Sequence, residues 1–259
     1  MRVDMNRPTH AIVRPPGKTY PRGLTRIDPP PPVDLALAAR QHAGYVAALR
    51  SLGLEVLELP ADDAHPDAVF VQDRAAIVDG RAIVAPSAVE SRRGEEEPIV
   101  ALLDGRFPIV TLERPASLDW GDVLITEDAL YVGLSERSNR QAAEQLREML
   151  APGRAVETVP TPADLLHLLS GCAYLGSGKL LSVESLAPFA RERGLEVVPV
   201  APDEALAANA LALGRDVVVP DGYPETRRRI EAAGLRTVAV PVSEFEKRDG
   251  GVTCLSIVY

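Results

Sequence analysis

The sequence predicts an α/β fold in which five similar units close into a ring, a five-bladed α/β propeller. Three copies of one pattern carry this prediction: a glycine, an apolar strand and a proline recur at 53–60, 194–200 and 234–241. Two weaker copies lie at 107–112 and 153–160. Glycine often ends a helix in the left-handed conformation, so each copy predicts a helix followed by a strand. Repeats of this length are typical of ring and array architectures.

Each of these strands is followed, after a short polar segment, by two more apolar runs that predict a hairpin. The clearest is 75–78 with 81–84, where Asp79-Gly80 indicates a type I′ turn. The other hairpins are expected at 123–126 with 130–132, 173–175 with 179–182, and 210–213 with 216–219. Apolar residues at helical spacing predict helices over 33–51, 92–103, 138–150, 185–193 and 223–233. The repeating unit is therefore expected to be strand, hairpin, helix.

The two ends of the chain are expected to meet. The last copy stops with a single strand after Cys254, so it lacks one strand that the other copies have. The apolar segment 9–14 is the natural candidate for that strand. Pairing of the first strand with the last unit would close the ring, so we expect residues 1–259 to form one domain.

Composition limits the functions that are open to the chain. It has 259 residues, 46% of them hydrophobic, a net charge of −9 and a pI near 5.1. An acidic surface repels nucleic acid and anionic membranes but favours a small cationic ligand. No apolar run approaches the roughly 18 residues of a membrane span, and no apolar signal segment opens the chain. We therefore expect a cytoplasmic protein with reduced thiols and with neither nucleic acid nor membrane as a partner.

Equivalent positions of a ring of five units face its central axis, and here these positions carry reactive side chains. The residues at the polar crossover before each hairpin are Asp67 or Asp73, Asp119 with Asp122, His167, Asn209 and Cys254. Chance would place mostly small or apolar residues there. The set therefore favours a functional site on the axis.

Cys254 is the candidate nucleophile. It follows an acidic, glycine-rich segment, 249–253, whose two glycines leave backbone N–H groups and space open beside the thiol. The alternative is a buried strand cysteine, since free cysteine is often buried. Cys172, in the small apolar segment 168–173, is expected to be an ordinary core residue.

A cysteine nucleophile needs a histidine as acid and base, and the histidine is usually oriented by a carboxylate. Cys254, His167 and Asp119 can supply these three roles. Carboxylates near the thiol would bind a planar cation such as a guanidinium, because their oxygens match its N–H groups. The sequence shows no metal-ligand spacing and no glycine-rich phosphate motif, so we expect neither a metal nor a cofactor.

Six collinear segments resemble the dimethylarginine dimethylaminohydrolase family. They are Phe70–Asp73, Glu90–Arg93, Leu118–Leu124, Tyr131–Asn139, Leu166–Leu168 and Glu244–Cys254, and the similarity runs from about Thr9 to Tyr259. The resemblance implies the pentein fold, which is a five-bladed α/β propeller of guanidine-modifying enzymes. It also implies hydrolysis of an Nω-methylated arginine to citrulline and a methylamine.

The resemblance assigns a role to each catalytic candidate. The Cys254 thiolate would attack the guanidinium carbon and form a covalent thiouronium intermediate. His167 would protonate the departing amine and then activate the hydrolytic water. Asp119 would orient the imidazole.

The resemblance also implies a set of substrate contacts. Asp73 would hold the guanidinium nitrogens and Asp67 the substrate α-amine. Arg92 and Arg137 would bind the α-carboxylate.

The resemblance implies two further substrate contacts, and the sequence departs from the family pattern at three positions. Leu24 matches a mobile lid, and the carbonyl of Arg248 lies where the family contacts substrate. Gln72 stands at a guanidinium-facing position where an acidic residue is common, so the preferred substrate can differ. Trp120 replaces a usual glycine, and Leu169 stands where a lysine is common.

Two alternatives remain open. One is an arginine deiminase-like or other guanidine hydrolase that uses the same thiol on a different substrate. The other is a non-catalytic five-bladed propeller that acts as a binding module, like the archaeal and eukaryotic ribosomal anti-association factor. That module would not need an aligned thiol, imidazole and carboxylate. A homodimer is also left open by the sequence.

Overall fold

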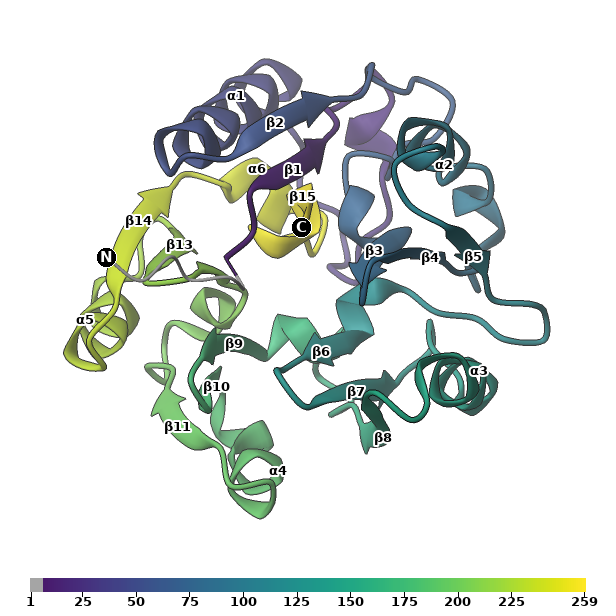
Figure 1. Cartoon of the computed structure of the whole chain (residues 1–259). Helices are drawn as coiled ribbons and strands as arrows, with labels where there is room; N and C mark the ends of the chain where they lie inside the picture. The colour runs from purple at the N-terminus through teal and green to yellow at the C-terminus, as the bar shows by residue number, and fades with distance from the viewer. Residues whose placement is uncertain (1–6) are drawn as a thin grey trace.

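A computed structural model describes residues 7–259, and within that range the strands form five three-stranded sheets. The sheets stand as blades around a central axis, and the ring is visible in Figure 1. The predicted five-bladed α/β propeller is confirmed.

The strands and helices lie close to their predicted positions. The five sheets, in hydrogen-bonding order, are β15 (Ser256–Val258), β1 (His10–Val13) and β2 (Glu55–Glu58); β3 (Ala75–Val78), β4 (Arg81–Val84) and β5 (Ile109–Thr111); β6 (Val123–Ile125), β7 (Ala129–Leu134) and β8 (Ala155–Pro160); β9 (Cys172–Gly176), β10 (Lys179–Ser182) and β11 (Glu196–Pro199); β12 (Leu211–Leu213), β13 (Asp216–Pro220) and β14 (Arg236–Val240). The helices are α1 (Leu35–Ser51), α2 (Glu97–Leu103), α3 (Arg140–Leu150), α4 (Ala187–Glu192), α5 (Pro224–Ala232) and the short α6 (Ser243–Glu246). Figure 1 shows α1 to α5 at the outer rim of the ring.

The division of the repeat into strand, hairpin, helix is wrong. In the second blade, β4 pairs antiparallel with β3 in the hairpin and parallel with β5, which follows α2. A crossover helix brings the chain back beside the strand that preceded it, so the strand after each helix completes the earlier sheet. The blade is therefore a hairpin, a helix and a strand.

Closure of the ring by the first strand is confirmed. β1 pairs antiparallel with β15 and parallel with β2, and Ile12 lies opposite Ile257. One blade thus contains strands from both ends of the described chain.

Local sequence signals explain where several elements begin and end. Asp79 and Gly80 both have positive φ, of 47° and 74°, as the expected type I′ turn requires. Asp34 caps α1, because its side chain accepts a hydrogen bond from the N–H of Leu37. Helix α2 begins at Glu97 instead of Arg92, because Arg92 lies in a separate 3₁₀ turn.

The core is divided among the interfaces between neighbouring blades. One hydrophobic cluster lies between the blade of β1 and the blade of β3, and it includes Ile12, Val71, Ile99 and Ile257. Four similar clusters occupy the remaining interfaces within residues 7–259. Each blade is therefore held by its two neighbours. No helix in this range is both long and apolar enough to cross a bilayer.

Replacement of Ile257 by Ala tests the contribution of this ring-closing strand. Ile257 is 2% exposed, so the change should lower the free energy of unfolding by about 2–5 kcal/mol in a urea titration. Ile125→Ala is the control, since Ile125 is 37% exposed on β6 and should lose less than about 1 kcal/mol. Equal losses in the two variants would contradict a ring held by β15.

Candidate active site

Five 3₁₀ turns, each just before a hairpin or its equivalent, bring the reactive residues to the axis. They span Val71–Asp73, Trp120–Asp122, Leu168–Ser170, Ala205–Ala208 and Thr253–Leu255. Asp73, Asp122 and Cys254 lie within their turns, His167 is the residue before its turn, and Asn209 is the residue after its own. Residues far apart in the sequence thereby become neighbours.

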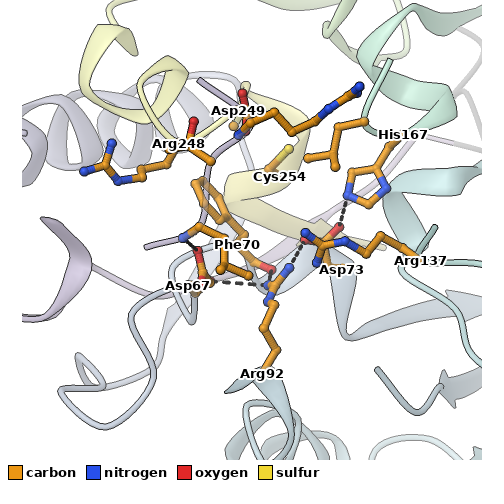
Figure 2. Close-up of a pocket in the computed structure, with 14 residues that line it drawn as sticks. Asp67, Phe70, Asp73, Arg92, Arg137, His167, Arg248, Asp249 and Cys254 are labelled. Atoms are coloured by element: carbon orange, nitrogen blue, oxygen red, sulfur yellow. Dashed lines mark hydrogen bonds and ion pairs between the residues drawn. The ribbon is translucent and has the colours of Figure 1, made fainter. Parts of the chain in front are cut away.

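One pocket, with a volume of about 130 Å³, collects all of the predicted site residues except Asp119 and Gln72. Figure 2 shows Cys254 between His167 and the turn of Arg248 and Asp249. The predicted residues that line the pocket are Leu24, Asp67, Asp73, Arg92, Arg137, His167, Arg248 and Cys254.

The Cys254 thiol is 8% exposed and is surrounded by hydrogen-bond donors. The N–H of Gly251 donates to Sγ at 3.4 Å, so the predicted backbone donor is present. The expected open space beside the glycines is absent, because Phe70 and Asn209 occupy it. A Cβ at Gly250 would lie 2.3 Å from Phe70, and a Cβ at Gly251 would lie 2.4 Å from Asn209. Burial, with the negative charge of Asp73, raises the pKa of Cys254 to about 11. The free protein therefore holds this thiol protonated near neutral pH.

The carboxylate that orients His167 is Asp122, and the expected role of Asp119 is wrong in this respect. Nδ1 of His167 lies 3.1 Å from Oδ2 of Asp122, whereas Asp119 lies on the other side, 4.0 Å from Nε2. Asp122 also accepts hydrogen bonds from Ser135, Ser138 and the N–H of Leu168, which fix its position. An anionic Asp122 makes Nδ1 the donor and leaves Nε2 toward the pocket.

The charges around His167 favour its protonated form. Burial opposes the charge, but the hydrogen bond to Asp122 and the carboxylates of Asp73 and Asp119 outweigh it and raise the pKa of His167 above its ordinary value. A protonated imidazole beside the thiol can act as a general acid.

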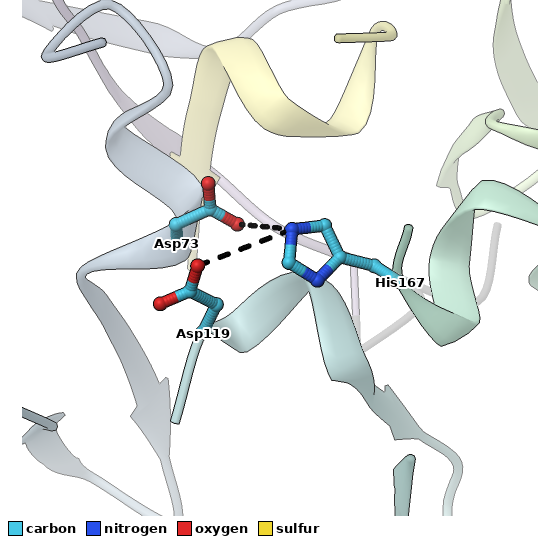
Figure 3. Close-up of side chains that lie close together, drawn as sticks. All are labelled: Asp73, Asp119 and His167. Carbon is cyan, nitrogen blue, oxygen red and sulfur yellow. Dashed lines mark ion pairs between the residues drawn. The ribbon is translucent and has the colours of Figure 1, made fainter. Parts of the chain in front are cut away.

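Two buried carboxylate oxygens face the same ring nitrogen, as Figure 3 shows. Oδ1 of Asp73 and Oδ2 of Asp119 lie 3.9 and 4.0 Å from Nε2 of His167. Among the described residues, neither oxygen receives a hydrogen bond. The other oxygen of each carboxylate is engaged, by Arg92 at Asp73 and by Arg74 at Asp119. Despite its burial, Arg92, His167 and Arg74 hold the pKa of Asp73 below its ordinary range.

This group is also the one place in residues 7–259 where at least three carboxylate, imidazole or thiol ligand atoms lie close enough together for a metal ion. Asp73, Asp119 and His167 could each offer one atom within 4.8 Å of the others, although their sequence spacing indicated no metal site. Arg92 and Arg74 already supply positive charge to the two carboxylates. Oδ1 of Asp73, which lines the pocket, therefore suits an N–H donor of a cationic ligand, whereas a metal ion would compete with two guanidinium groups.

The expected role of Arg92 in binding a substrate carboxylate does not fit its contacts. Its guanidinium donates to Asp73 at 2.7 Å and pairs with Glu95 through Nε and Nη2 at 2.9–3.1 Å. Burial opposes the charge on Arg92, but Asp73 and Glu95 outweigh it and raise its pKa. Arg137 is 15% exposed, and its guanidinium lies 3.8 Å from Asp119, so it is the more available of the two arginines.

The segment of Leu24 covers the pocket and is joined to it by hydrogen bonds. Leu24 is 40% exposed, and its N–H donates to Oδ1 of Asp67 at 2.9 Å. Arg26 reaches the other rim, where its N–H donates to Asp249 and its side chain to the carbonyl of Ala163. Burial raises the pKa of Asp67, against the opposing effects of Arg92 and the N–H of Leu24.

Gln72 lies outside this pocket. It lines a second cavity of about 220 Å³ between the inner strands, together with Leu169 and Trp120. Its side-chain amide donates to the carbonyl of Trp120 at 2.9 Å. Trp120 is 1% exposed and packs in the core between the second and third blades. The three departures from the family pattern therefore lie in the axial cavity.

Sequence reasoning missed the roles of three residues. Asp122 was placed on the axis but was not assigned to His167, although, like Asp73, it ends a 3₁₀ turn before a hairpin. Arg74 and Glu95 are 1% exposed: Arg74 pairs with Asp119, and Glu95 pairs with Arg74 and Arg92. Arg74 follows Gln72 and Asp73, and Glu95 lies in the charged segment 90–97, so neither position gave a sequence signal of burial or of a partner.

Comparison with known proteins gives a consistent result. A family model described as N,N dimethylarginine dimethylhydrolase, eukaryotic, matches residues 32–161. N(G),N(G)-dimethylarginine dimethylaminohydrolase of Pseudomonas aeruginosa is 33% identical over 96% of this chain and 98% of its own. The protein of that name in Streptomyces coelicolor is 36% identical over 95% of each chain. The structure of a cysteine-to-serine mutant of the P. aeruginosa enzyme, complexed with citrulline, matches with a TM-score of 0.92 and 32% identity over 98% of this chain and 100% of that one.

The five blades and the thiol, imidazole and carboxylates on their axis define a protein of the pentein class. Within that class, identity of 33–36% along nearly the whole chain decides the family. The chain belongs to the dimethylarginine dimethylaminohydrolase family.

The orientation of His167 can be tested by replacing its neighbours. Asp122→Asn removes the charge at Nδ1 and leaves only a neutral amide as its partner, so it should lower the pKa of His167 in an NMR titration of the ring. Asp119→Asn is the matched control: it removes one charge without a hydrogen bond to the ring, so its effect should be smaller. A larger shift in Asp119→Asn would contradict our assignment of Asp122.

The raised pKa of Cys254 predicts a specific dependence of stability on pH. The folded pKa of about 11 exceeds the ordinary value of 9.0, so the protonated thiol favours folding. This contribution is present below pH 9 and is lost as pH rises through 11. Urea unfolding should show wild type losing about 2 kcal/mol relative to Cys254→Ser between pH 8 and 10.5. Parallel pH profiles of the two proteins would contradict it.

Proposed function

We propose that this protein hydrolyses Nω-methylated L-arginine, such as asymmetric dimethylarginine or monomethylarginine, to L-citrulline and a methylamine. One observation carries the proposal. Oδ1 of Asp73, on the wall of the Cys254 pocket, receives no hydrogen bond within residues 7–259 and lies 3.9 Å from Nε2 of His167. A substituted guanidinium supplies the missing N–H donor and a carbon that a thiol can attack.

Relatives support the choice of substrate. The matching enzymes of P. aeruginosa and S. coelicolor carry the name of this activity, and the former's mutant has been seen with citrulline, which would be the product here. The proposed cysteine, histidine and carboxylates lie in different blades of the same ring.

The bound cation would itself activate the nucleophile. The free thiol has a pKa of about 11 because it is buried near the charge of Asp73. A guanidinium placed against Sγ adds a positive charge at close range, and such a charge favours the thiolate. We therefore infer that the reactive thiolate forms mainly in the complex with substrate.

The covalent steps then balance with no added reactant except water. As the substrate binds, the thiol releases its proton to solvent. The thiolate then forms a C–S bond with the guanidinium carbon, and the protonated His167 gives its Nε2 proton to the substituted nitrogen as the C–N bond breaks. A neutral methylamine leaves and a thiouronium remains on Cys254. Neutral His167 next takes a proton from water, whose oxygen attacks the same carbon. Collapse breaks the C–S bond and releases citrulline and the thiol.

The amino-acid end of the substrate would meet the opposite part of the pocket. Asp67 and the carbonyl of Arg248 are our candidates for the α-amine, and Arg137 for the α-carboxylate. Leu24 would close over the bound molecule, since its N–H already contacts Asp67. We assign Arg92 to holding Asp73 in place, because its contacts with Asp73 and Glu95 occupy its donors.

The deiminase-like alternative loses part of its support. Gln72 and Trp120 were the residues that could have changed the substrate, but both line the axial cavity and not the pocket of Cys254. The charge lost at Gln72 is therefore not lost from the wall that faces the thiol.

A citrulline assay with purified protein tests the proposal. Arginine, monomethylarginine and asymmetric dimethylarginine are supplied in parallel, with a chelator present. We expect citrulline from the methylated substrates, and a fall of at least about 1,000-fold in kcat for Cys254→Ser, because the covalent path requires the thiol. Cys172→Ala is the matched control and should keep wild-type activity, since Cys172 is a core residue of β9.

Two results would overturn the assignment. Citrulline from arginine alone would make the protein a deiminase. Citrulline from none of the three, with Cys254 still reactive toward iodoacetamide, would exclude methylarginine hydrolysis.

A further inference from the structure

Asn209 is the one axial residue to which neither the resemblance nor the proposed reaction assigns a role. It follows the turn Ala205–Ala208 and is 7% exposed. In the other four blades the corresponding residues are Asp73, Asp122, His167 and Cys254. A buried amide at this position must find partners, because an unsatisfied polar group costs about 1–3 kcal/mol.

The side chain of Asn209 uses both ends of its amide. Oδ1 accepts hydrogen bonds from the N–H of Thr253 at 2.9 Å and from its hydroxyl at 3.0 Å. Nδ2 donates to the carbonyl of Leu169 at 3.2 Å and lies 3.9 Å from Sγ of Cys254. The amide thus links the turn that contains Cys254 to the turn after His167.

Backbone partners decide which way the amide points. The N–H of Thr253 can only donate, and the carbonyl of Leu169 can only accept, so Oδ1 must face Thr253 and Nδ2 must face Leu169. The second hydrogen of Nδ2 is then left for the sulfur of Cys254. A flipped amide would break two buried hydrogen bonds.

Gly251 completes this arrangement. A Cβ at Gly251 would lie 2.4 Å from Cγ and Oδ1 of Asn209, so the two residues can pack together only because position 251 lacks a side chain. In this position the N–H of Gly251 donates to Sγ at 3.4 Å. Two N–H groups from different blades therefore converge on one sulfur.

We propose that Asn209 is a positioning residue for the nucleophile: with the N–H of Gly251 it forms a donor pair that stabilises the Cys254 thiolate and fixes the direction of its attack. Hydrogen bonds to an ionised acceptor are stronger than those to a neutral one, so the pair favours the thiolate over the thiol. After the C–S bond forms, the sulfur is no longer an anion and this advantage is lost. The inference rests on the proposed function only in taking Cys254 as the nucleophile.

Substitution of Asn209 separates this role from simple packing. Asn209→Ala removes the acceptor for Thr253 and the donor to the carbonyl of Leu169 and to Sγ of Cys254. Asn209→Asp keeps an acceptor for Thr253 but turns a carboxylate oxygen toward Sγ. The titratable groups that surround the thiol, Asp73, His167, Tyr20 and Tyr45, stay unchanged in both variants, as do the arginines across the pocket.

The first measurement needs no substrate. Thiolate absorbance at 240 nm and the rate of alkylation by iodoacetamide are followed against pH, with Cys254→Ser as the blank. We expect Asn209→Ala to slow alkylation at pH 8 about tenfold, which is a shift of about one pH unit, and Asn209→Asp to slow it further. The matched control is Asn139→Ala, whose amide caps α3 with a similar set of backbone contacts and should leave the thiol unchanged.

The second measurement is turnover of the methylated substrates. Asn209 does not line the pocket, so kcat should fall about 10–100-fold in Asn209→Ala while KM changes less than about threefold. Wild-type alkylation profiles in a folded Asn209→Ala variant would overturn the inference. If that variant fails to fold, a wild-type profile in Asn209→Asp would overturn it instead. If the Asn209 variants keep the wild-type alkylation profile and wild type hydrolyses the substrates, only the role of Asn209 is refuted.

If the Asn209 variants have shifted profiles but wild type hydrolyses none of the substrates, only the proposed substrate is refuted.

Discussion

The pairing of β15 with β1 is the contact on which the site depends. It joins the last strand to the first, and Ile12 and Ile257 face each other across it within a buried cluster. Cys254 lies in the turn just before β15. The hydroxyl of Tyr45 on α1 lies 2.7 Å from the hydroxyl of Ser256, the first residue of β15, and this hydrogen bond holds the strand to the helix. A slip of one residue in this register would turn the inward side chains of β15 outward. Closure of the ring and position of the nucleophile are therefore one structural event.

Buried charge is the second constraint, and it acts across blades. Asp73, Asp119 and Glu95 are almost fully buried, and Arg74 and Arg92 are buried with them. Removal of one member would leave an unpaired buried charge, which typically costs 3–5 kcal/mol. The network therefore leaves the carboxylates little freedom to move. This explains how Asp73 and Asp119 can each keep one oxygen without a hydrogen bond in the described structure: the arginines hold the other oxygen.

Most of the fold could be predicted from the sequence, because its signals are local. Helix-ending glycines, apolar runs and the Asp79-Gly80 turn depend on a few neighbouring residues, and the repeat multiplies them. The grouping of strands into sheets could not be read in the same way, since it is decided by where a helix returns the chain. The wrong grouping of β2 has this cause. Its sequence pattern resembles that of a strand that leads into the next hairpin, but the strand pairs with β1.

The sequence could predict which residues form the site but not the direction in which each side chain points. Asp119 and Asp122 belong to one short segment, and only the rotation of the turn decides that Asp122 meets Nδ1 of His167. Gln72 and Asp73 are adjacent, yet one lines the axial cavity and the other the pocket of Cys254. Successive residues of a 3₁₀ turn point about a third of a circle apart. Side-chain direction in such turns therefore has no sequence signal comparable to the alternation of a strand.

The same geometry shifts the pKa values of the thiol and the imidazole in the protein without a ligand. Burial and the charge of Asp73 raise the pKa of Cys254 to about 11, and, against the effect of burial, the hydrogen bond to Asp122 and the nearby carboxylates raise the pKa of His167. A neutral thiol is a poor nucleophile, whereas an imidazolium can donate a proton. In the reaction proposed above, the charge of a bound guanidinium would favour the thiolate, and His167 would still have to carry the proton that it gives to the departing amine. On this proposal a neutral molecule in the same pocket would not favour the thiolate, so charge would contribute to the choice of substrate.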